Sequence, residues 1–221
     1  MDPEREHCCF DEWAVANAKR ARRKEIASGV TRQLMTALGR SRVEGRTVLD
    51  LGCGTGDLAL ATLARGATRA TGVDLGPQAI EEARTLASER GIADRSVFLE
   101  GDAAKVPLER HDVVVLNRVF CCYPDVEGLL QNSLPAAGQV YAYSAPRSRG
   151  IVGTFNRAQL WLSNVWFRVR RRKFRGFRVY VHDLDAVDRR IREEGFVPVI
   201  EAHRRLVWHL GIYERPPSGV S

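Results

Sequence analysis

Nine residues in the first quarter of the chain constrain its fold more than any other feature. Residues 48–56 read Val-Leu-Asp-Leu-Gly-Cys-Gly-Thr-Gly, an apolar strand that runs through Asp50 into a turn with glycines at positions 52, 54 and 56. Alternate glycines let the backbone take positive φ and let a ligand approach the main chain closely. Asp74 follows about 20 residues later, where nucleotide-binding α/β folds place the carboxylate that holds ribose hydroxyls. The pair predicts a site for a small nucleoside-like molecule.

The charges around this turn favour one kind of nucleotide. Dinucleotide folds use G-x-G-x-x-G to seat a pyrophosphate at a helix N-terminus. Here the turn reads G-x-G-x-G, with Asp50 before it and Asp57 after it. Two carboxylates repel a pyrophosphate and attract a cation, because opposite charges about 4 Å apart gain roughly 4 kcal/mol at an effective dielectric near 20. S-adenosylmethionine fits, since it carries an ammonium and a sulfonium and no phosphate.

The region of residues 46–145 resembles the class I S-adenosylmethionine-dependent methyltransferases. Four segments match the motifs of that family in order: residues 48–56, 72–75, 101–103 and 112–117. The resemblance implies cofactor-binding roles for nine residues: Asp50, Gly52, Gly54, Gly56, Asp74, Leu75, Asp102, Ala103 and Asn117. The glycine loop would cradle the methionine portion, Asp74 would bind the ribose, Asp102 would reach the adenine amino group, and the chain around Asn117 would close the methionine side.

The order of apolar segments predicts an α/β architecture. We expect strands at 47–51, 70–74, 96–99, 112–117 and 139–144, and helices at 57–65, 77–90, 125–134 and 183–194. This alternation indicates a Rossmann-like, doubly wound, mostly parallel sheet of seven strands, because two strand-like runs after Gly195 form a closing antiparallel pair.

A single domain over residues 1–221 is expected, with four parts. Residues 1–45 form an N-terminal helical cap, 46–145 the cofactor-binding core, 147–180 a basic aromatic insertion, and 181–215 the last helix and closing strands. The chain shows no apolar run of 18 residues and no charged-then-apolar start, so we expect a cytoplasmic enzyme.

The five cysteines make a poor disulfide framework, because they are odd in number and include two adjacent pairs, Cys8-Cys9 and Cys121-Cys122. We expect reduced thiols and no metal. A zinc site would require the two pairs to meet in space, and buried cysteine more often serves as a small apolar residue.

The segment after the fourth predicted strand bears on the methyl acceptor. Enzymes that methylate base amino groups carry Pro-Pro and an aromatic residue there, whereas Asn117 is followed by Arg-Val-Phe. The next residues, 121–125, read Cys-Cys-Tyr-Pro-Asp and distantly resemble the His-Tyr-Pro segment of magnesium-protoporphyrin O-methyltransferases. Cys122 stands where those enzymes have histidine, and a thiol differs from an imidazole as an acid and a base.

Tyr123 and His182 are the candidate catalytic residues. A carboxylate acceptor is already ionised, but a phenol or an alcohol needs a general base within hydrogen-bond reach. Tyr123 lies in a loop at a strand carboxyl end, where open α/β sheets hold ligands. His182 precedes the last helix, and the alternative for it is a capping or packing role.

Residues 147–178 carry ten positive charges and no acidic residue. These ten charges exceed the whole-chain net charge of +7, so the rest of the chain has a net charge of about −3. Apolar residues recur every three or four positions, so we expect an amphipathic helix over about 154–169. Trp161, Trp166 and Phe167 are candidate walls of the acceptor site beneath a helical lid. Alternatives are a surface for acidic lipid, a nucleic-acid patch, and a packed helix with solvated arginines.

These features predict a methyltransferase for a small anionic or aromatic acceptor, with O-methylation favoured. An RNA or ribosomal methyltransferase that uses the basic segment is a second hypothesis, and a non-catalytic cofactor-binding scaffold is a third. The oligomeric state is not written in the sequence.

Overall fold

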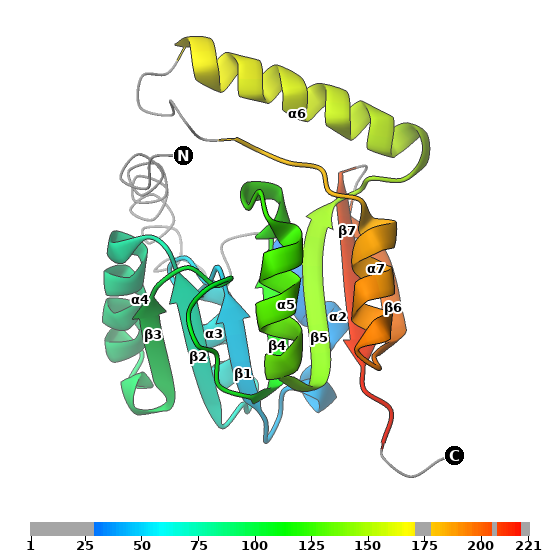
Figure 1. Ribbon diagram of the computed structural model, residues 1–221. Helices are drawn as coiled ribbons and strands as arrows, with labels where there is room; N and C mark the ends of the chain where they lie inside the picture. Colours follow the sequence, from blue (N-terminus) through cyan, green and yellow to red (C-terminus); the bar gives the residue numbers. More distant parts are fainter. Residues whose placement is uncertain (1–28, 171–177, 205–206, 218–221) are drawn as a thin grey trace.

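The computed structural model describes residues 29–170, 178–204 and 207–217, and a seven-stranded sheet in the order β3-β2-β1-β4-β5-β7-β6 forms its centre (Figure 1). The strands are β1 (Thr47–Leu51), β2 (Arg69–Asp74), β3 (Ser96–Glu100), β4 (His111–Asn117), β5 (Ala137–Pro146), β6 (Val197–Arg204) and β7 (Trp208–Glu214). Strands β1 to β5 run parallel, and β7 pairs antiparallel with both β5 and β6. The predicted Rossmann-like sheet with its antiparallel closure is confirmed.

Helices cover both faces of this sheet. Helices α2 (Gly29–Leu38), α3 (Asp57–Ala64) and α4 (Pro77–Glu89) pack on one face, and α5 (Val126–Ala136) and α7 (Leu184–Glu193) pack on the other. Figure 1 shows α5 and α7 in front of the sheet, with α2 and α3 behind it. The long helix α6 (Gly150–Arg170) lies across the edge at which the parallel strands end (Figure 1).

The observed elements agree closely with those expected from the apolar periodicity. Pro77 occupies the first turn of α4, where its missing N–H costs nothing. The helix expected within 154–169 extends over Gly150–Arg170. Of the N-terminal helical cap expected over residues 1–45, the structure describes α2, while residues 1–28 lie outside the described part.

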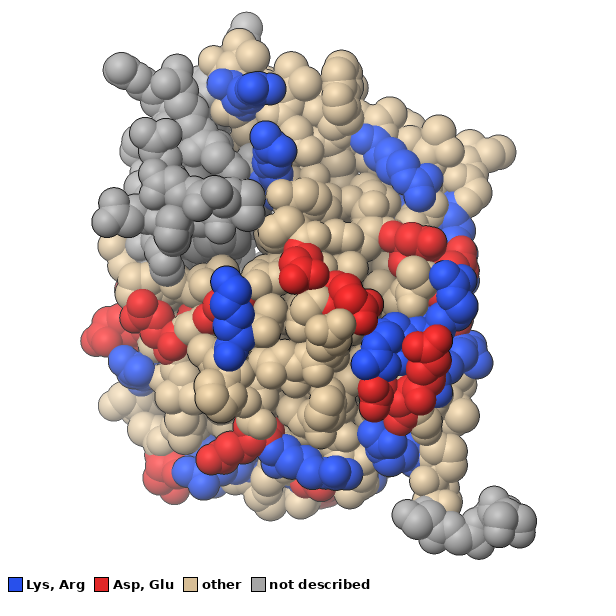
Figure 2. All heavy atoms as spheres, viewed as in Figure 1, with Lys and Arg blue, Asp and Glu red and all other residues tan. Residues whose placement is uncertain are grey.

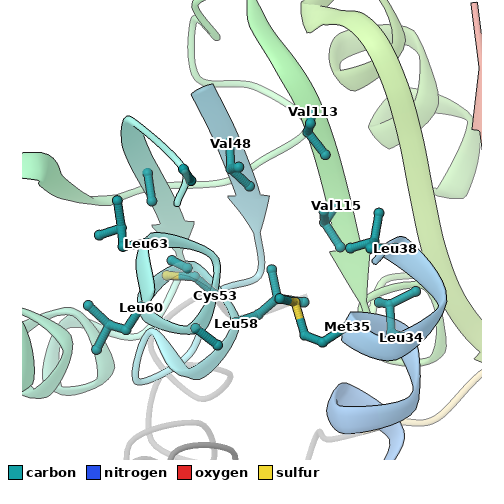
Figure 3. Close-up of a cluster of buried hydrophobic side chains, with 14 of the residues drawn as sticks. Leu34, Met35, Leu38, Val48, Cys53, Leu58, Leu60, Leu63, Val113 and Val115 are labelled. Atoms are coloured by element: carbon teal, nitrogen blue, oxygen red, sulfur yellow. The ribbon is translucent and has the colours of Figure 1, made fainter. Parts of the chain in front are cut away.

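Two apolar cores hold the sheet between its helices. In the core of Figure 3, side chains of α2 such as Leu34 and Leu38 meet side chains of α3 and of strands β1 and β4. Val113 and Val115 of β4 are completely buried there. Each fully buried aliphatic side chain contributes about 1.5–3 kcal/mol, so this packing holds the ends of β1 and β4 in place.

The strand order reverses between β1 and β4. Strands β2 and β3 lie on one side of β1, whereas β4 and β5 lie on its other side. Open α/β sheets bind ligands at the carboxyl ends of the strands beside such a switch point. The carboxyl ends of β1, β2 and β4 carry Asp50, Asp74 and Asn117. The topology therefore brings the residues of the predicted cofactor site to one edge.

Candidate cofactor and active site

The glycine loop after β1 is tied back to β2 and lies open on its outer side. Both Gly52 and Cys53 donate backbone hydrogen bonds to the carbonyl of Val73, at 2.7 and 3.1 Å. Gly52 has φ 69°, and a Cβ there would lie 2.5 Å from a methyl group of Val119. Gly54 has φ 54°, and no described heavy atom lies within 4 Å of a Cβ built on it. The loop thus offers exposed backbone to a ligand at Gly54.

Asp74 joins the glycine loop after β1 to the segment that precedes α4. Its carboxylate accepts hydrogen bonds from the backbone N–H groups of Gly54 at 2.8 Å and Gly76 at 2.9 Å. These bonds fix the carboxylate at the carboxyl end of β2, and a carboxylate oxygen is the acceptor that a ribose hydroxyl needs. The position at the end of β2 agrees with the predicted ribose contact, which stays a prediction.

Asp50 lies beneath the loop, with 1% of its surface exposed. Its carboxyl accepts a hydrogen bond from the N–H of Ala59 in α3, at 3.2 Å. Burial, with a smaller contribution from the nearby carboxylates of Asp74 and Asp57, raises the pKa of Asp50 to about 8. The sequence argument assigned Asp50 a negative charge that attracts the cofactor. The structure differs, because a desolvated carboxyl is neutral at pH 7 and supports the helix N-terminus.

The loop after β3 carries the predicted adenine side of the site. Gly101 donates its N–H to the carbonyl of Asp74 at 2.9 Å, so the ends of β2 and β3 lie side by side. The Asp102 carboxylate accepts from the Tyr123 hydroxyl at 2.6 Å and pairs with Lys105 at 2.8 Å. Burial opposes ionisation of Asp102, but the bonds from Lys105, Tyr123 and the Ala104 N–H lower its pKa below the usual value. Asp102 is therefore a charged acceptor.

Two smaller side chains flank the same region. Leu75 is half-buried after β2, and Ala103 is buried with 9% exposure after β3. Their places at adjacent strand ends agree with apolar contacts to an adenine ring, which stay predictions.

Asn117 connects three elements at the end of β4. Its amide nitrogen donates to the Thr31 hydroxyl of α2 at 2.8 Å, and its oxygen accepts from the Ser144 hydroxyl of β5 at 2.8 Å. The side chain therefore positions α2 against the sheet, while the backbone around Asn117 borders the loop. The sequence pattern identified Asn117 but not Thr31 or Ser144, because their contacts join segments far apart in the chain.

Arg118 is a site residue that the sequence analysis did not select. It has φ 64°, the one positive φ of a non-glycine residue in the described chain. Its backbone N–H bonds to the Ser144 hydroxyl at 2.9 Å, and its buried Nε has no hydrogen-bond partner among the residues that the structure describes. A positive charge directly after β4 was the available signal, since that segment borders the ligand site in open α/β sheets.

Cys121 and Cys122 lie beside this arginine. Their sulfur atoms are 3.5 Å apart, and the Cys121 thiol donates to the carbonyl of Arg118 at 3.1 Å. The hydrogen bond between the two sulfur atoms, together with the Arg118 charge, lowers the pKa of Cys122. Cys8 and Cys9 lie outside the described residues. Among those described, no three His, Cys, Asp or Glu side chains gather as metal ligands would.

Tyr123 and His182, the two predicted catalytic residues, come together although 59 positions separate them. The backbone of Tyr180 donates to the carbonyl of Cys121 at 2.8 Å, so this segment runs beside η3 (Phe120–Cys122). His182 Nε2 lies 2.9 Å from the carbonyl oxygen of Tyr123. A carbonyl only accepts, so Nε2 carries the proton and Nδ1 holds the lone pair of the neutral ring.

The predicted acceptor walls on α6 do not all face the sheet. Trp161 and Trp166 are 63% and 42% exposed, whereas Phe167 is half-buried and contacts the Trp166 ring edge-on at 5.4 Å. The face that anchors α6 carries Asn156 and Asn164 instead, whose amides bond to the chain at Val207 and Val179. Helical geometry places Trp161 and Trp166 off the anchored face, and their role as acceptor walls stays a prediction.

Comparisons with known proteins agree with this geometry. Residues 48–135 match a family described as a methyltransferase domain. A ribosomal protein L11 methyltransferase from Enterobacter sp. is 45% identical over 76 residues, which are 34% of this chain and 25% of that protein. The matched stretch thus spans about a quarter of the length of these relatives.

Solved structures extend the likeness to most of the fold. A magnesium protoporphyrin IX methyltransferase from Synechocystis PCC 6803 with bound S-adenosylhomocysteine has a TM-score of 0.67 at 20% identity and covers 86% of this chain and 85% of its own. A sarcosine dimethylglycine methyltransferase from Galdieria sulphuraria has a TM-score of 0.65 at 14% identity, with 84% of each chain covered.

Residues 48–135 thus match a methyltransferase domain, and the chain shares its fold with solved methyltransferases. The open backbone at Gly54, with the carboxylates of Asp74 and Asp102 beside it, fits S-adenosylmethionine.

Proposed function

We propose that this protein transfers a methyl group from S-adenosylmethionine to an oxygen atom of a small anionic or aromatic acceptor. The observation that carries the proposal is the hydrogen bond of His182 to the Tyr123 carbonyl, in the segment after β4 that also contains Arg118. His182 supplies a proton acceptor, Tyr123 supplies the carbonyl that holds it, and Arg118 supplies a positive charge.

The cofactor supplies an electrophilic methyl group on a positively charged sulfur. The chain binds and orients it: Asp74 accepts from the ribose hydroxyls, Asp102 accepts from the adenine amino group, and the Gly52–Gly56 backbone holds the methionine end. Methyl transfer is an in-line displacement, so alignment accounts for much of the rate. The rigid sheet edge beneath these groups provides that alignment.

His182 removes the acceptor proton when the acceptor is a phenol or an alcohol. Its Nε2 proton is held by the carbonyl of Tyr123, which directs the lone pair to Nδ1. Within the described residues, Nδ1 has no hydrogen-bond partner. The ring also stacks on Tyr180 with 5.8 Å between ring centroids, which limits its rotation. A carboxylate acceptor would need no such base.

Arg118 supports an anionic acceptor. Its buried Nε has no partner in the described part of the chain, which is costly, and a ligand carboxylate or phenolate would accept from it. A hydrogen bond to a charged group contributes about 1.5–3 kcal/mol. Arg118→Gln is therefore expected to raise the KM of a carboxylate acceptor about tenfold or more, and Arg118→Lys should restore part of that loss.

The experiment is a screen for cofactor-dependent methyl transfer to metabolite, RNA and ribosome fractions, followed by His182→Ala on the acceptor found. If His182 removes a proton, the variant loses turnover with little loss of S-adenosylhomocysteine affinity, and added imidazole restores part of the rate. His203→Ala is the matched control, since that histidine is exposed on β6. Unchanged turnover in His182→Ala would remove the histidine from the mechanism.

RNA or ribosomal methylation is a second candidate, favoured by the basic segment and by the similarity to a ribosomal protein methyltransferase. Transfer of the methyl group to the RNA or ribosome fraction, and none to the metabolite fraction, would support this second function. Cofactor binding with no transfer to any fraction would favour a scaffold.

A further inference from the structure

Helix α6 carries most of the large apolar side chains that are exposed in the described chain. Ile151 is 90% exposed, Val169 76% and Leu162 59%, and Phe155, Trp161, Val165 and Trp166 are exposed as well. Elsewhere the exposed large apolar residues are Leu99, Val197 and Val199. Single exposed apolar residues are ordinary, but a gathered set marks an interaction surface.

Five of these residues form one stripe along the helix. Ile151, Phe155, Leu162, Val165 and Val169 follow each other at spacings of four, seven, three and four, which places them on one helical face. We call this set the apolar stripe.

The opposite face of α6 is fastened to the protein. The Asn156 amide donates to the carbonyls of Arg147 and Val207 at 3.0 and 3.2 Å. Asn164 exchanges two hydrogen bonds with the backbone of Val179, at 2.9 and 2.8 Å. A Cβ on Gly153 would lie 2.0 Å from the Ser148 carbonyl oxygen, so the helix approaches the chain closely there. These contacts turn the apolar stripe away from the sheet.

The charge around the stripe has one sign. Arg157 and Arg168 are exposed on α6, and residues 147–178 hold ten basic residues and no acidic one. Figure 2 shows blue and tan atoms over α6 at the top of the view, while the red carboxylates lie lower on the molecule. Exposed apolar residues bordered by arginines match the interface of a bilayer that contains acidic lipid.

We propose that α6 binds the surface of an anionic phospholipid membrane, with the apolar stripe in the headgroup boundary and the arginines at the lipid phosphates. Within the described residues, no helix is long and apolar enough to cross a bilayer, so α6 would lie in the plane of the surface. A second copy of the chain is a poorer occupant, because it would bring its own basic residues against these. Since α6 crosses the strand edge that holds the site, this orientation would set the site beside the membrane (Figure 1).

The test is flotation of the full chain with vesicles of phosphatidylcholine containing about one-third phosphatidylglycerol, against phosphatidylcholine alone. We expect binding to the acidic vesicles that weakens as salt rises. Leu162→Glu should lower partitioning about tenfold or more, the loss expected for a buried aliphatic side chain. Arg157→Gln and Arg168→Gln should each lower it about fivefold.

Two changes outside α6 serve as matched controls. Leu99→Glu alters an exposed apolar residue of β3, and Arg69→Gln alters an exposed basic residue of β2. Both should float as the unchanged chain does, and all variants should keep their melting temperatures. Equal flotation of Leu162→Glu, or equal binding to neutral vesicles, would overturn the proposal. A dimer that Leu162→Glu dissociates, with no lipid binding, would assign the stripe to a second copy.

Discussion

The protonation state of Asp50 makes the stability of this protein depend on pH in a calculable way. With a pKa of about 8, the folded protein keeps the Asp50 proton at neutral pH, whereas the unfolded chain releases it near pH 3.9. The folded state then binds more protons between these values, so this contribution to stability is full below the unfolded pKa, falls as the pH rises from there, and is lost once the pH has passed the folded pKa. From pH 6 to pH 9 this group lowers the free energy of unfolding by about 3 kcal/mol.

Asp50→Asn removes this dependence while keeping a similar shape and an oxygen that can accept from Ala59. Urea unfolding at pH 6, 7, 8 and 9 in the presence of a reductant should show the free-energy difference between the two proteins changing by about 2–3 kcal/mol in favour of the variant. Burial is the main cause that raises the pKa of Cys53, with Asp74 and Asp50 contributing less, so the cysteine contribution largely cancels in the difference.

Asp94→Asn is the control, because Asp94 is exposed. It should track the unchanged chain at every pH. If the free energy of unfolding of Asp50→Asn also runs parallel to that of the unchanged chain from pH 6 to 9, the buried carboxyl is ionised throughout. Burial would then not hold the Asp50 proton.

Three further changes test the site and the closing strands. Gly54→Val should abolish S-adenosylhomocysteine binding in calorimetry. Gly91→Val is its control and should keep the binding, because Gly91 has a similar φ of 65° and likewise no described heavy atom within 4 Å of an added Cβ. Tyr123→Phe should weaken that binding about tenfold by removing the 2.6 Å bond to Asp102, and unchanged affinity would argue against the link. Burial and the nearby His203 lower the pKa of His209 to about 4, so melting temperatures should rise from pH 4 to 6.5, and His209→Gln should flatten that rise.

Much of the cofactor half could be predicted because its signals are local. The apolar run of β1, the glycines after it and the acidic residue that ends β2 lie close together in sequence, and parallel strand pairing then places them at one edge. The acceptor half depends on contacts between distant segments. His182 reaches the carbonyl of Tyr123 across 59 positions, and no periodicity predicts that contact.

By itself, the sequence determined the alternation of strands and helices, the glycine turn, and the amphipathic character of α6, because hydrophobic period and glycine conformation act over a few residues. Tertiary structure decided the rest. It buried Asp50 and so removed a charge that composition assigned to the site, and it left the Arg118 Nε unpaired. It also fastened α6 through Asn156 and Asn164, which turned the apolar stripe outward. Whether a charged group is buried, and which way a helix face points, depend on which distant segments pack together. A local sequence pattern does not contain that information.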